Sequence, residues 1–387
     1  MPTIEFPLFL KMLKKILLIL VVTFFFSCKQ TTEKQAEVTQ KNTNVSYAEG
    51  FTIQNFESYK ILTVKNPWPG ATETFSYALV EKGTTLPNIE KVTAVVEVPL
   101  ENIVVTSTTH IPSLEMLGVE NKLIGFPNLE YISSKKTRTL IDAGNIKELG
   151  KNEDINTEVL IDLQPDALVT FAVEGHNKTA SAIEKTGIPV LYNADWTETH
   201  PLGKAEWIKF FGALFGKEKE AESIFSTIEK EYNEAKSLAA TATTAPTVLS
   251  GAMFKDVWYL PQGDSWAAQF IKDANGTYLW KDSEGTGSLS LNLETVLEKA
   301  QFADYWIGPS QFTTYQQMRE AHTVYQEFKA FKEQKAFSFT TKKGATGGVI
   351  YYELAPNRPD LVLKDIIKIL HPEVLPDYEL FFFAPLQ

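Results

Sequence analysis

From residue 102 onward, short apolar runs alternate with stretches of helical periodicity, and this alternation restricts the folds open to the chain. Residues 102–107, 122–126 and 167–171 are apolar runs bounded by polar or glycine-containing segments, as expected of buried strands. Residues 157–163 lie between two of these runs and have the spacing of a helix. Strands that alternate with helices predict a parallel sheet with helices on its faces.

A long helical pattern over residues 201–245 divides this alternation into two halves. The same order of Asn, Glu, helix, Asp and apolar strand occurs in both halves, at residues 156–170 and 292–307. Gly216 is a point at which the long helical pattern can break. The sequence therefore predicts an α/β fold with two Rossmann-like lobes joined by a long bridging α-helix.

The start of the chain and the segment before the first lobe have different compositions. Residues 29–46 carry almost no apolar side chains and cannot bury a core, which is typical of a flexible tether. Residues 47–99 are β-like, with strand patterns at "YKILTV" and "FSYALV", and no function follows from them. The predicted division is a signal peptide at 1–28, a tether at 29–46, a first lobe at 47–200, a bridging segment at 201–245 and a second lobe at 246–387.

Cys28 is the only cysteine of the chain, and it follows the features of a secretory signal. Lys14 and Lys15 precede an apolar run at residues 16–26, and the small residue Ser27 stands before the cysteine. The run is shorter than the roughly 20 residues that a membrane-spanning helix needs. The layout resembles the processing site of bacterial lipoproteins, in which the cysteine is lipidated. An ordinary signal peptide or an N-terminal anchor is the alternative.

Charge and cysteine content exclude several classes of function. The formal net charge of −11 argues against a nucleic-acid partner and against binding of anionic lipid through protein charge. A single cysteine leaves no internal disulfide and no thiolate metal site. The motifs G-x-S-x-G, H-E-x-x-H and the Walker A loop are missing from the sequence. We therefore expect no enzyme and no cofactor, with a cell-surface hydrolase as an alternative.

Several segments in order resemble the substrate-binding proteins of ABC importers for iron complexes, ferric siderophores and cobalamin. They include "THIPSLEMLGVENKLIGF", "EVLIDLQPDALVTF", "VWYLPQGDSWAAQFIKDANGTYLWKD" and "RPDLVLKDIIKILHPE". The resemblance implies two α/β lobes bridged by a helix, and a monomer in the periplasm, held at a membrane through Cys28. It implies capture of a ferric siderophore, or of a haem or cobalamin-like chelate, and delivery to an ABC permease in the inner membrane.

Loops that follow the predicted strands are the expected place for a ligand, because ligands bind outside the carboxyl ends of strands in open α/β sheets. These loops and their neighbours are rich in aromatic and polar residues, the usual composition of a small-molecule site. Arg358 precedes a predicted C-terminal helix and could pair with an anionic chelate. The candidate ligand-binding residues are Thr108, His110, Trp196, Phe254, Trp258, Tyr259 and Arg358.

Three histidines offer an alternative to a chelate site. His110, His176 and His200 fall in loops after first-lobe strands, and imidazole binds transition metals. A direct metal-ion receptor is therefore the alternative, but the chain lacks a histidine-rich loop, and we expect no metal ligands. The resemblance also implies an exposed acidic residue on each lobe that docks on the permease. Glu174 is the candidate in the first lobe.

Overall fold

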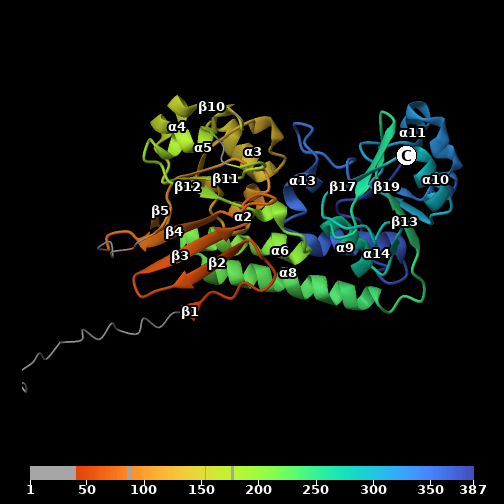
Figure 1. The fold of residues 1–387 in the computed structure, drawn as a ribbon, viewed down its shortest axis with the longest axis horizontal. Helices are drawn as coiled ribbons and strands as arrows, with labels where there is room; N and C mark the ends of the chain where they lie inside the picture. The colour runs from red at the N-terminus through yellow and green to blue at the C-terminus, as the bar shows by residue number, and fades with distance from the viewer. Residues whose placement is uncertain (1–40, 85–88, 90, 153, 176–177) are drawn as a thin grey trace, which may run out of the picture. The chain divides into compact units, whose positions relative to one another are not determined.

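The computed structural model describes residues 41–84, 89, 91–152, 154–175 and 178–387 (Figure 1). Cys28, the predicted signal peptide and most of the predicted tether lie outside the described residues, as does His176. Within the described part, no helix combines the length and the apolar character that crossing a bilayer requires.

The first lobe is built on a five-stranded parallel sheet with the strand order β12-β11-β6-β7-β8. Its strands are β6 (Ile103–Val105), β7 (Leu123–Phe126), β8 (Lys147–Glu148), β11 (Ala167–Thr170) and β12 (Val190–Tyr192), and its helices are α2 (His110–Met116), α3 (Lys135–Asp142), α4 (Thr157–Leu163) and α5 (Lys178–Glu184). The side chain of Asn156 accepts the backbone N–H of Val159 and caps α4, so that this helix begins where the sequence predicts it. Short elements complete the lobe: η2 (Glu120–Lys122), η3 (Leu129–Tyr131), η4 (Asp195–Thr197) and the hairpin of β9 (Gly150–Lys151) and β10 (Asp154–Ile155).

The second lobe repeats this plan and adds a small antiparallel sheet. Its main sheet has the order β16-β13-β18-β19-β20, in which only the pairing of β19 with β20 is antiparallel among the described strands. The strands are β13 (Thr247–Ser250), β16 (Thr277–Tyr278), β18 (Tyr305–Ile307), β19 (Ala336–Ser338) and β20 (Ala384–Pro385). The added sheet consists of β14 (Ala252–Phe254), β15 (Val257–Pro261) and β17 (Ser288–Leu291).

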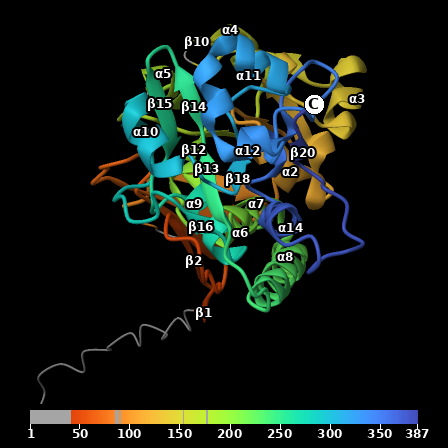
Figure 2. The ribbon, with the colours of Figure 1, turned by 90° about the vertical axis from the view of Figure 1, so that its right-hand side faces the viewer.

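Helices surround the second-lobe sheet, and one of them reaches the segment between the lobes. The helices are α9 (Trp266–Asp273), α10 (Leu293–Ala300), α11 (Tyr315–Ala321), η5 (Thr323–Glu327), α12 (Lys329–Lys332), α13 (Ile350–Leu354) and α14 (Pro359–Leu370). The apolar stripe of α14, predicted from the sequence, is buried. It packs against α8 (Glu218–Ala239), and Figure 2 shows the two helices next to each other.

The predicted bridging segment forms three helices instead of one continuous rod. They are α6 (Pro201–Glu206), α7 (Ile208–Phe215) and α8. Gly216 ends α7 with a φ of 64°, a left-handed conformation that glycine adopts without strain, and this confirms the predicted break. The 22-residue α8 contacts α7 at one end and α14 of the second lobe (Figure 1).

The β-like start of the chain forms a sheet of its own with the order β1-β2-β3-β4-β5. Its strands are β1 (Lys41–Asn42), β2 (Phe51–Asn55), β3 (Tyr59–Lys65), β4 (Thr74–Glu81) and β5 (Ala94–Val98). Both strand predictions in this region are confirmed, because β3 and β4 pair antiparallel along the whole of β3. The sheet packs against the helices through aromatic rings. Phe51 of β2 contacts the buried Trp207, which lies between α6 and α7, and the ring centroids are 4.6 Å apart.

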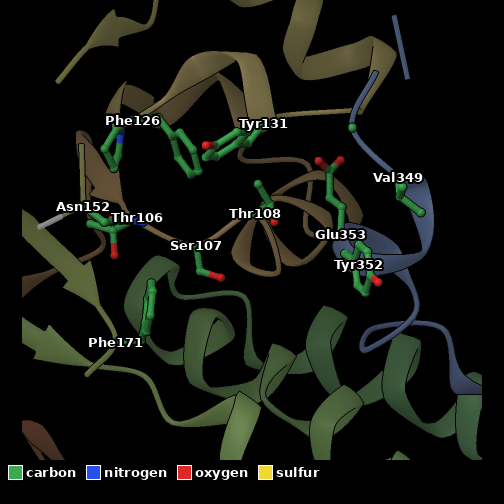
Figure 3. A pocket seen from close by; sticks show the side chains of 12 residues that line it. Thr106, Ser107, Thr108, Phe126, Tyr131, Asn152, Phe171, Val349, Tyr352 and Glu353 are labelled. Atoms are coloured by element: carbon green, nitrogen blue, oxygen red, sulfur yellow. The ribbon is translucent and has the colours of Figure 1, made fainter. Parts of the chain in front are cut away.

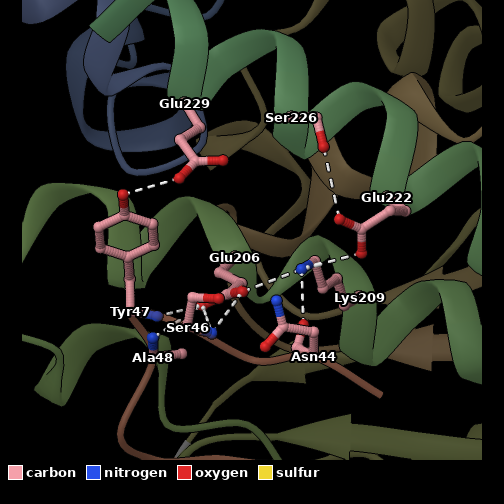
Figure 4. Close-up of polar contacts among 9 residues, drawn as sticks. All are labelled: Asn44, Ser46, Tyr47, Ala48, Glu206, Lys209, Glu222, Ser226 and Glu229. Atoms are coloured by element: carbon pink, nitrogen blue, oxygen red, sulfur yellow. Dashed lines mark hydrogen bonds and ion pairs between the residues drawn. The ribbon is translucent and has the colours of Figure 1, made fainter. Parts of the chain in front are cut away.

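Two buried carboxylates, those of Glu206 and Glu198, hold the segment that leads into this sheet. Figure 4 shows the contacts of Glu206. Glu206 of α6 is fully buried, and its carboxylate accepts the backbone N–H groups of Ser46, Tyr47 and Ala48 at 2.7–3.0 Å. The Lys209 ammonium lies 3.0 Å from the same carboxylate and also donates to the carbonyl of Asn44. These bonds fix the backbone just before β2 against the helices.

Glu198 holds the next two residues of the same backbone segment in the same way. Its carboxylate accepts the N–H groups of Glu49 and Gly50 and the indole N–H of Trp207. A side chain at Gly50 would meet the Trp207 ring at 2.8 Å, so this close approach needs glycine. Five consecutive backbone N–H groups, from residue 46 to residue 50, thus end on two carboxylates.

We expect Glu206→Gln to lower the free energy of unfolding by about 2–4 kcal/mol, because it removes a buried charge that several donors and Lys209 face. Urea unfolding followed by circular dichroism measures this loss. Glu234→Gln is the matched control, since Glu234 is an exposed partner of Lys230 and should change stability by less than about 0.5 kcal/mol. Equal stability of the two variants would contradict an anchoring role of Glu206.

Candidate ligand-binding site

Between the two lobes, at the carboxyl ends of first-lobe strands, lies a cavity of about 320 Å³. Larger hollows lie elsewhere in the described part of the chain, but we call this one the main cavity because of its position. Most of its first-lobe wall comes from the ends of β6, β7 and β11, as expected for an open α/β sheet. Its wall consists of Thr106, Ser107, Thr108, Phe126, Pro127, Tyr131, Asn152 and Phe171 from the first lobe and Gly348, Val349, Tyr352 and Glu353 from the second (Figure 3).

Hydroxyl groups line the part of the cavity that follows β6. The Thr106 hydroxyl lies 3.0 Å from the hydroxyl of Thr170, which stands at the end of the neighbouring strand β11. The Ser107 hydroxyl lies 2.9 Å from that of Thr109, so the turn into α2 is held locally. Thr108, a predicted ligand-binding residue, is half-buried and lines the cavity.

The second-lobe wall belongs to a segment that crosses to the first lobe, residues 341–358, which we call the strap. Glu353 of α13 accepts the backbone N–H groups of Ser133 and Ser134 of the first lobe, at 2.6 and 2.9 Å. Asn357 accepts the hydroxyl of Ser113 at 2.8 Å and donates to the carbonyl of Thr109 at 2.8 Å. The strap therefore joins the lobes at the edge of the cavity.

Two glycines allow the strap to lie directly on the first lobe. A side chain at Gly344 would come within 2.7 Å of the Ser133 backbone, and one at Gly348 within 2.6 Å of the Ser133 hydroxyl. The glycine-rich sequence "GATGGV" is thus explained by close backbone packing between lobes.

Glu353 is buried, and its ionisation depends on opposing effects. Burial, with a smaller contribution from the nearby Glu115 carboxylate, raises the pKa of this carboxyl to about 7. The N–H groups of Ser133 and Ser134 act in the opposite direction, because they stabilise the charged form. Glu353 therefore titrates near neutral pH while it lines the cavity.

Aromatic rings from both lobes face the cavity. Tyr131 and Tyr352 each expose 59% of their surface, an unusual fraction for a large aromatic side chain in a folded protein. Figure 3 shows Tyr131 on the first-lobe side and Tyr352 on the strap, with Phe126 and Phe171 on the remaining walls. Among the described lining residues, Glu353 carries the one formal charge, and lysine and arginine are absent from the wall.

Two residues predicted from first-lobe loops lie away from this cavity. His110 begins α2 but is buried against Phe211, with ring centroids 5.5 Å apart, and burial lowers its pKa to about 4. Trp196 is 37% exposed and lines a different cavity. The two side chains therefore do not lie together at the main cavity, as the sequence analysis expected. The loop after β6 lines this cavity through residues 106–108, but the His110 ring is buried in the core.

Three predicted residues fall in the added antiparallel sheet of the second lobe. Trp258 is fully buried on β15, stacks on Trp306 with centroids 5.4 Å apart and donates its indole N–H to the Ser250 carbonyl. Its position in the core differs from the expected one at the cavity. Phe254 and Tyr259 are exposed, at 66% and 42%, but lie outside the main cavity.

Arg358 and Glu174 have distinct surroundings. The Arg358 guanidinium donates two bonds to the Asp360 carboxylate, at 2.9 and 2.7 Å, and lies outside the main cavity. Pairing with an anionic chelate would compete with this ion pair. Glu174 is exposed in the loop after β11, in a small hollow that shares Asn152 and Phe171 with the main cavity. It therefore stands at the rim.

The histidines of the metal-ion alternative do not assemble into a site within the described residues. His200 caps α6 by accepting the N–H of Leu202, and its ring stacks on Tyr47 at 5.2 Å. His110 lies in the core, and His176 is outside the described residues. In the part of the chain that the structure describes, no three residues of the types His, Cys, Asp and Glu are grouped so as to hold a metal ion.

Several cavity residues were not predicted from the sequence. Phe126 and Pro127 directly follow the predicted strand at 122–126, so the strand-end rule could have identified them. Tyr352 and Glu353 follow no strand, and their place depends on the strap crossing between lobes, for which the sequence offers only the glycines at 344, 347 and 348.

A model of the family described as periplasmic binding protein matches residues 103–341. The chain belongs to this family. The family and the α/β fold predicted from the sequence are thereby confirmed. Periplasmic binding proteins of this kind bind solutes for transport, and the family is not one of enzymes.

Individual relatives agree with this assignment. An uncharacterised lipoprotein of Methanocaldococcus jannaschii is 28% identical over 303 residues, which cover 75% of this chain and 69% of the relative. A possible iron-binding, periplasmic solute-binding protein of Staphylococcus epidermidis has a TM-score of 0.55 at 16% identity, covering 71% of this chain and 100% of its own. The structure of an ABC-type Fe³⁺-hydroxamate transport system of Saccharomonospora viridis has a TM-score of 0.53 at 16% identity and covers 70% and 94%. At these identities the two structures support the fold.

We expect Glu353 to make this periplasmic binding protein more stable at acid pH than at neutral pH. Its folded pKa of about 7 lies above the usual 4.5, so its contribution is fully present below pH 4.5 and is lost as the pH rises through about 7. Relative to Glu353→Gln, the free energy of unfolding should fall by up to about 3 kcal/mol between these pH values. Urea unfolding at pH 4.5, 6 and 8 measures the difference.

Glu130→Gln provides the control for this pH dependence, because Glu130 is an exposed glutamate in the same part of the first lobe. Its stability profile should run parallel to that of the unmodified protein. A Glu353→Gln profile that also runs parallel would contradict titration of Glu353 near neutral pH.

Proposed function

We propose that the protein is a lipid-anchored receptor that captures an iron chelate in the main cavity and delivers it to an ABC permease. The observation that carries this proposal is a cavity between two lobes, lined by aromatic rings and hydroxyl groups, in a periplasmic binding protein. Aromatic walls suit the organic shell of a chelate, which brings its own metal ligands. The lack of a metal-binding cluster among the described residues is consistent with a metal that arrives already coordinated.

The charge of the wall favours a neutral or cationic chelate. Glu353 is the charged group in the described wall, and its carboxylate would repel an anionic complex when it is ionised. Recognition of a strongly anionic chelate normally uses lysine or arginine, and Arg358, the cation among the candidate residues, pairs with Asp360. A ferric trihydroxamate, in which three monoanionic groups neutralise Fe³⁺, fits this wall better than a trianionic ferric tris-catecholate or a haem with two carboxylates.

We expect a neutral ferric trihydroxamate to quench the intrinsic fluorescence of the purified protein more strongly, and at lower concentration, than a tris-catecholate complex, haem or cobalamin. Tyr352→Ala and Tyr131→Ala should each weaken binding by about 1–3 kcal/mol, because each removes an exposed ring from the wall. Fluorescence titration and calorimetry measure both effects.

Phe302→Ala is the control for loss of an exposed ring, since Phe302 is 75% exposed and lies outside the cavity. It should leave the affinity unchanged. If a trianionic complex binds most tightly, the preference for a neutral chelate is wrong. If the protein binds none of these complexes but retains a bare metal ion, the metal-ion receptor is favoured. Hydrolysis of a test substrate would favour the hydrolase alternative.

Anchoring through Cys28 remains part of the proposal. It is supported by the signal layout in the sequence and by a relative named as a lipoprotein. We expect Cys28→Ser to release the protein from the membrane fraction or to leave it unprocessed, because lipid chains anchor a protein by burying their CH₂ groups. Fractionation and mass spectrometry of the N-terminal peptide measure this. A processed variant that stays in the membrane would argue for another anchor.

For delivery of the chelate, we propose that the permease docks at the rim of the main cavity, on Glu174. Glu174 is exposed in a hollow that adjoins the main cavity, where a permease can reach it, and rim charges mainly control association rate and orientation. We expect Glu174→Arg to keep the affinity for the chelate within about twofold while it lowers uptake by cells that depend on this receptor. Glu158→Arg, an exposed change on α4, is the control. Lost chelate affinity in Glu174→Arg would instead place the residue in the ligand site.

A further inference from the structure

A second cavity, of about 500 Å³, lies where the N-terminal sheet meets both lobes. Among the described residues, it shares no lining residue with the main cavity. Its walls are Glu49, Gly50 and the β3–β4 turn (Asn66 and residues 68–71) from the N-terminal part, residues 196–199 from the first lobe, Lys204 from α6 of the bridging segment, and Trp266, Thr286 and Gly287 from the second lobe. The match to the family begins at residue 103, so the N-terminal wall lies outside it.

The polar contacts around this cavity give it a fixed wall. Glu198 holds the N–H groups of Glu49 and Gly50, as described above. On the second-lobe side, the Gln262 side chain accepts the N–H of Gly287 at 2.9 Å. Hydrogen bonds therefore fix the N-terminal part of the wall to the first lobe and fix Gly287 within the second lobe.

Three tryptophans, one from the N-terminal part and one from each lobe, line the cavity. Trp68 packs edge-on against Tyr192, with centroids 6.0 Å apart, and little of its side chain is exposed. Trp266 packs against Phe270 at 5.5 Å. Trp196 is the most exposed of the three, at 37%, and offers a ring surface to a ligand. Indole rings supply large, rigid contact surfaces that suit a flat apolar face.

Lys204 and Glu198, two of the charged groups in the wall, are held by hydrogen bonds within the protein. The buried Lys204 ammonium donates to the carbonyls of Asp195 and Trp196 at 3.0 Å and lies 5.2 Å from the Trp266 ring centroid. Within the described contacts, this leaves one of its three hydrogens for an oxygen acceptor. The Glu198 carboxylate is occupied by three donors.

The wall carries both signs of charge, because the Lys204 ammonium lies among the carboxylates of Glu49 and Glu198. It therefore presents no surface of a single sign to a strongly charged ligand. A neutral molecule suits this wall if it has an apolar face for the indoles and oxygen atoms for Lys204 and for the hydroxyls of Thr197, Thr199 and Thr286. A saccharide ring combines these features, because its C–H groups form the face and its hydroxyls the edge.

We propose that the second cavity is a binding site for a neutral saccharide, separate from the chelate site. The ring stacks on Trp196, and the Lys204 ammonium donates to one of its oxygens. A volume of about 500 Å³ is within the range of small-molecule sites. The site depends on the N-terminal sheet, which supplies one wall.

Calorimetric titration of the purified full chain with maltotriose, cellotriose and chitotriose tests the proposal. At least one of these neutral trisaccharides should bind with one-to-one stoichiometry. Trp196→Ala removes the exposed ring, and Thr286→Trp fills the cavity from an exposed position without a change in the core. Each variant should weaken trisaccharide binding at least tenfold and leave binding of a ferric trihydroxamate unchanged.

Phe302→Ala, the exposed aromatic control outside both cavities, should bind the trisaccharide as the unmodified protein does. Absence of binding for all three trisaccharides, or binding that both variants leave intact, would overturn the proposal. Competition between the trisaccharide and the ferric trihydroxamate would also overturn it, because the second cavity would then belong to the chelate site. Trisaccharide binding that depends on Trp196 would support it even if no chelate binds.

Discussion

Buried carboxylates that accept backbone N–H groups connect the separate parts of this chain. Glu206 and Glu198 hold residues 46–50 and with them the N-terminal sheet. Glu353 holds Ser133 and Ser134 and joins the lobes. Asp365 of α14 accepts the N–H groups of residues 381–383 and the hydroxyl of Tyr378, and so fixes the C-terminal segment.

These carboxylates share one physical property. Each is removed from water, and each recovers the lost hydration through several donors, which is the condition under which a buried charge is tolerated. Burial nevertheless raises the pKa of Glu198, Glu353 and Asp365, so the recovery is incomplete. Three of the joins between parts of the molecule therefore contain a group whose protonation changes the stability.

Local sequence patterns predicted most regular elements, because these depend on neighbouring residues. Helix α4 begins and ends where its periodicity and its Asn156 cap indicate. The strands β3 and β4 were visible as separate apolar runs. By contrast, Trp258 looked like a residue of an exposed loop, since its burial depends on pairing of β15 with both β14 and β17. Such long-range pairing leaves little trace in a local pattern.

In the candidate site, too, local patterns predicted some residues, and long-range contacts place the others. Thr108 follows a strand and was predicted, whereas Tyr352 reaches the cavity only because the strap crosses to the other lobe. Trp196 was predicted as a ligand contact, but the N-terminal sheet encloses it in a cavity that a two-lobe scheme does not contain. The sequence thus predicted the contribution of each sheet separately and missed the contacts between parts.

The strap has a kinetic consequence. Because α8 and the strap join the lobes at two places, an opening of the cavity on the strap side requires the loss of a few hydrogen bonds instead of the bending of a 22-residue helix. Local openings of this kind occur far more often than global unfolding. The residence time of a bound solute would then be determined by how often Glu353 and Asn357 release the first lobe, and a transporter that pulls on the strap would shorten it.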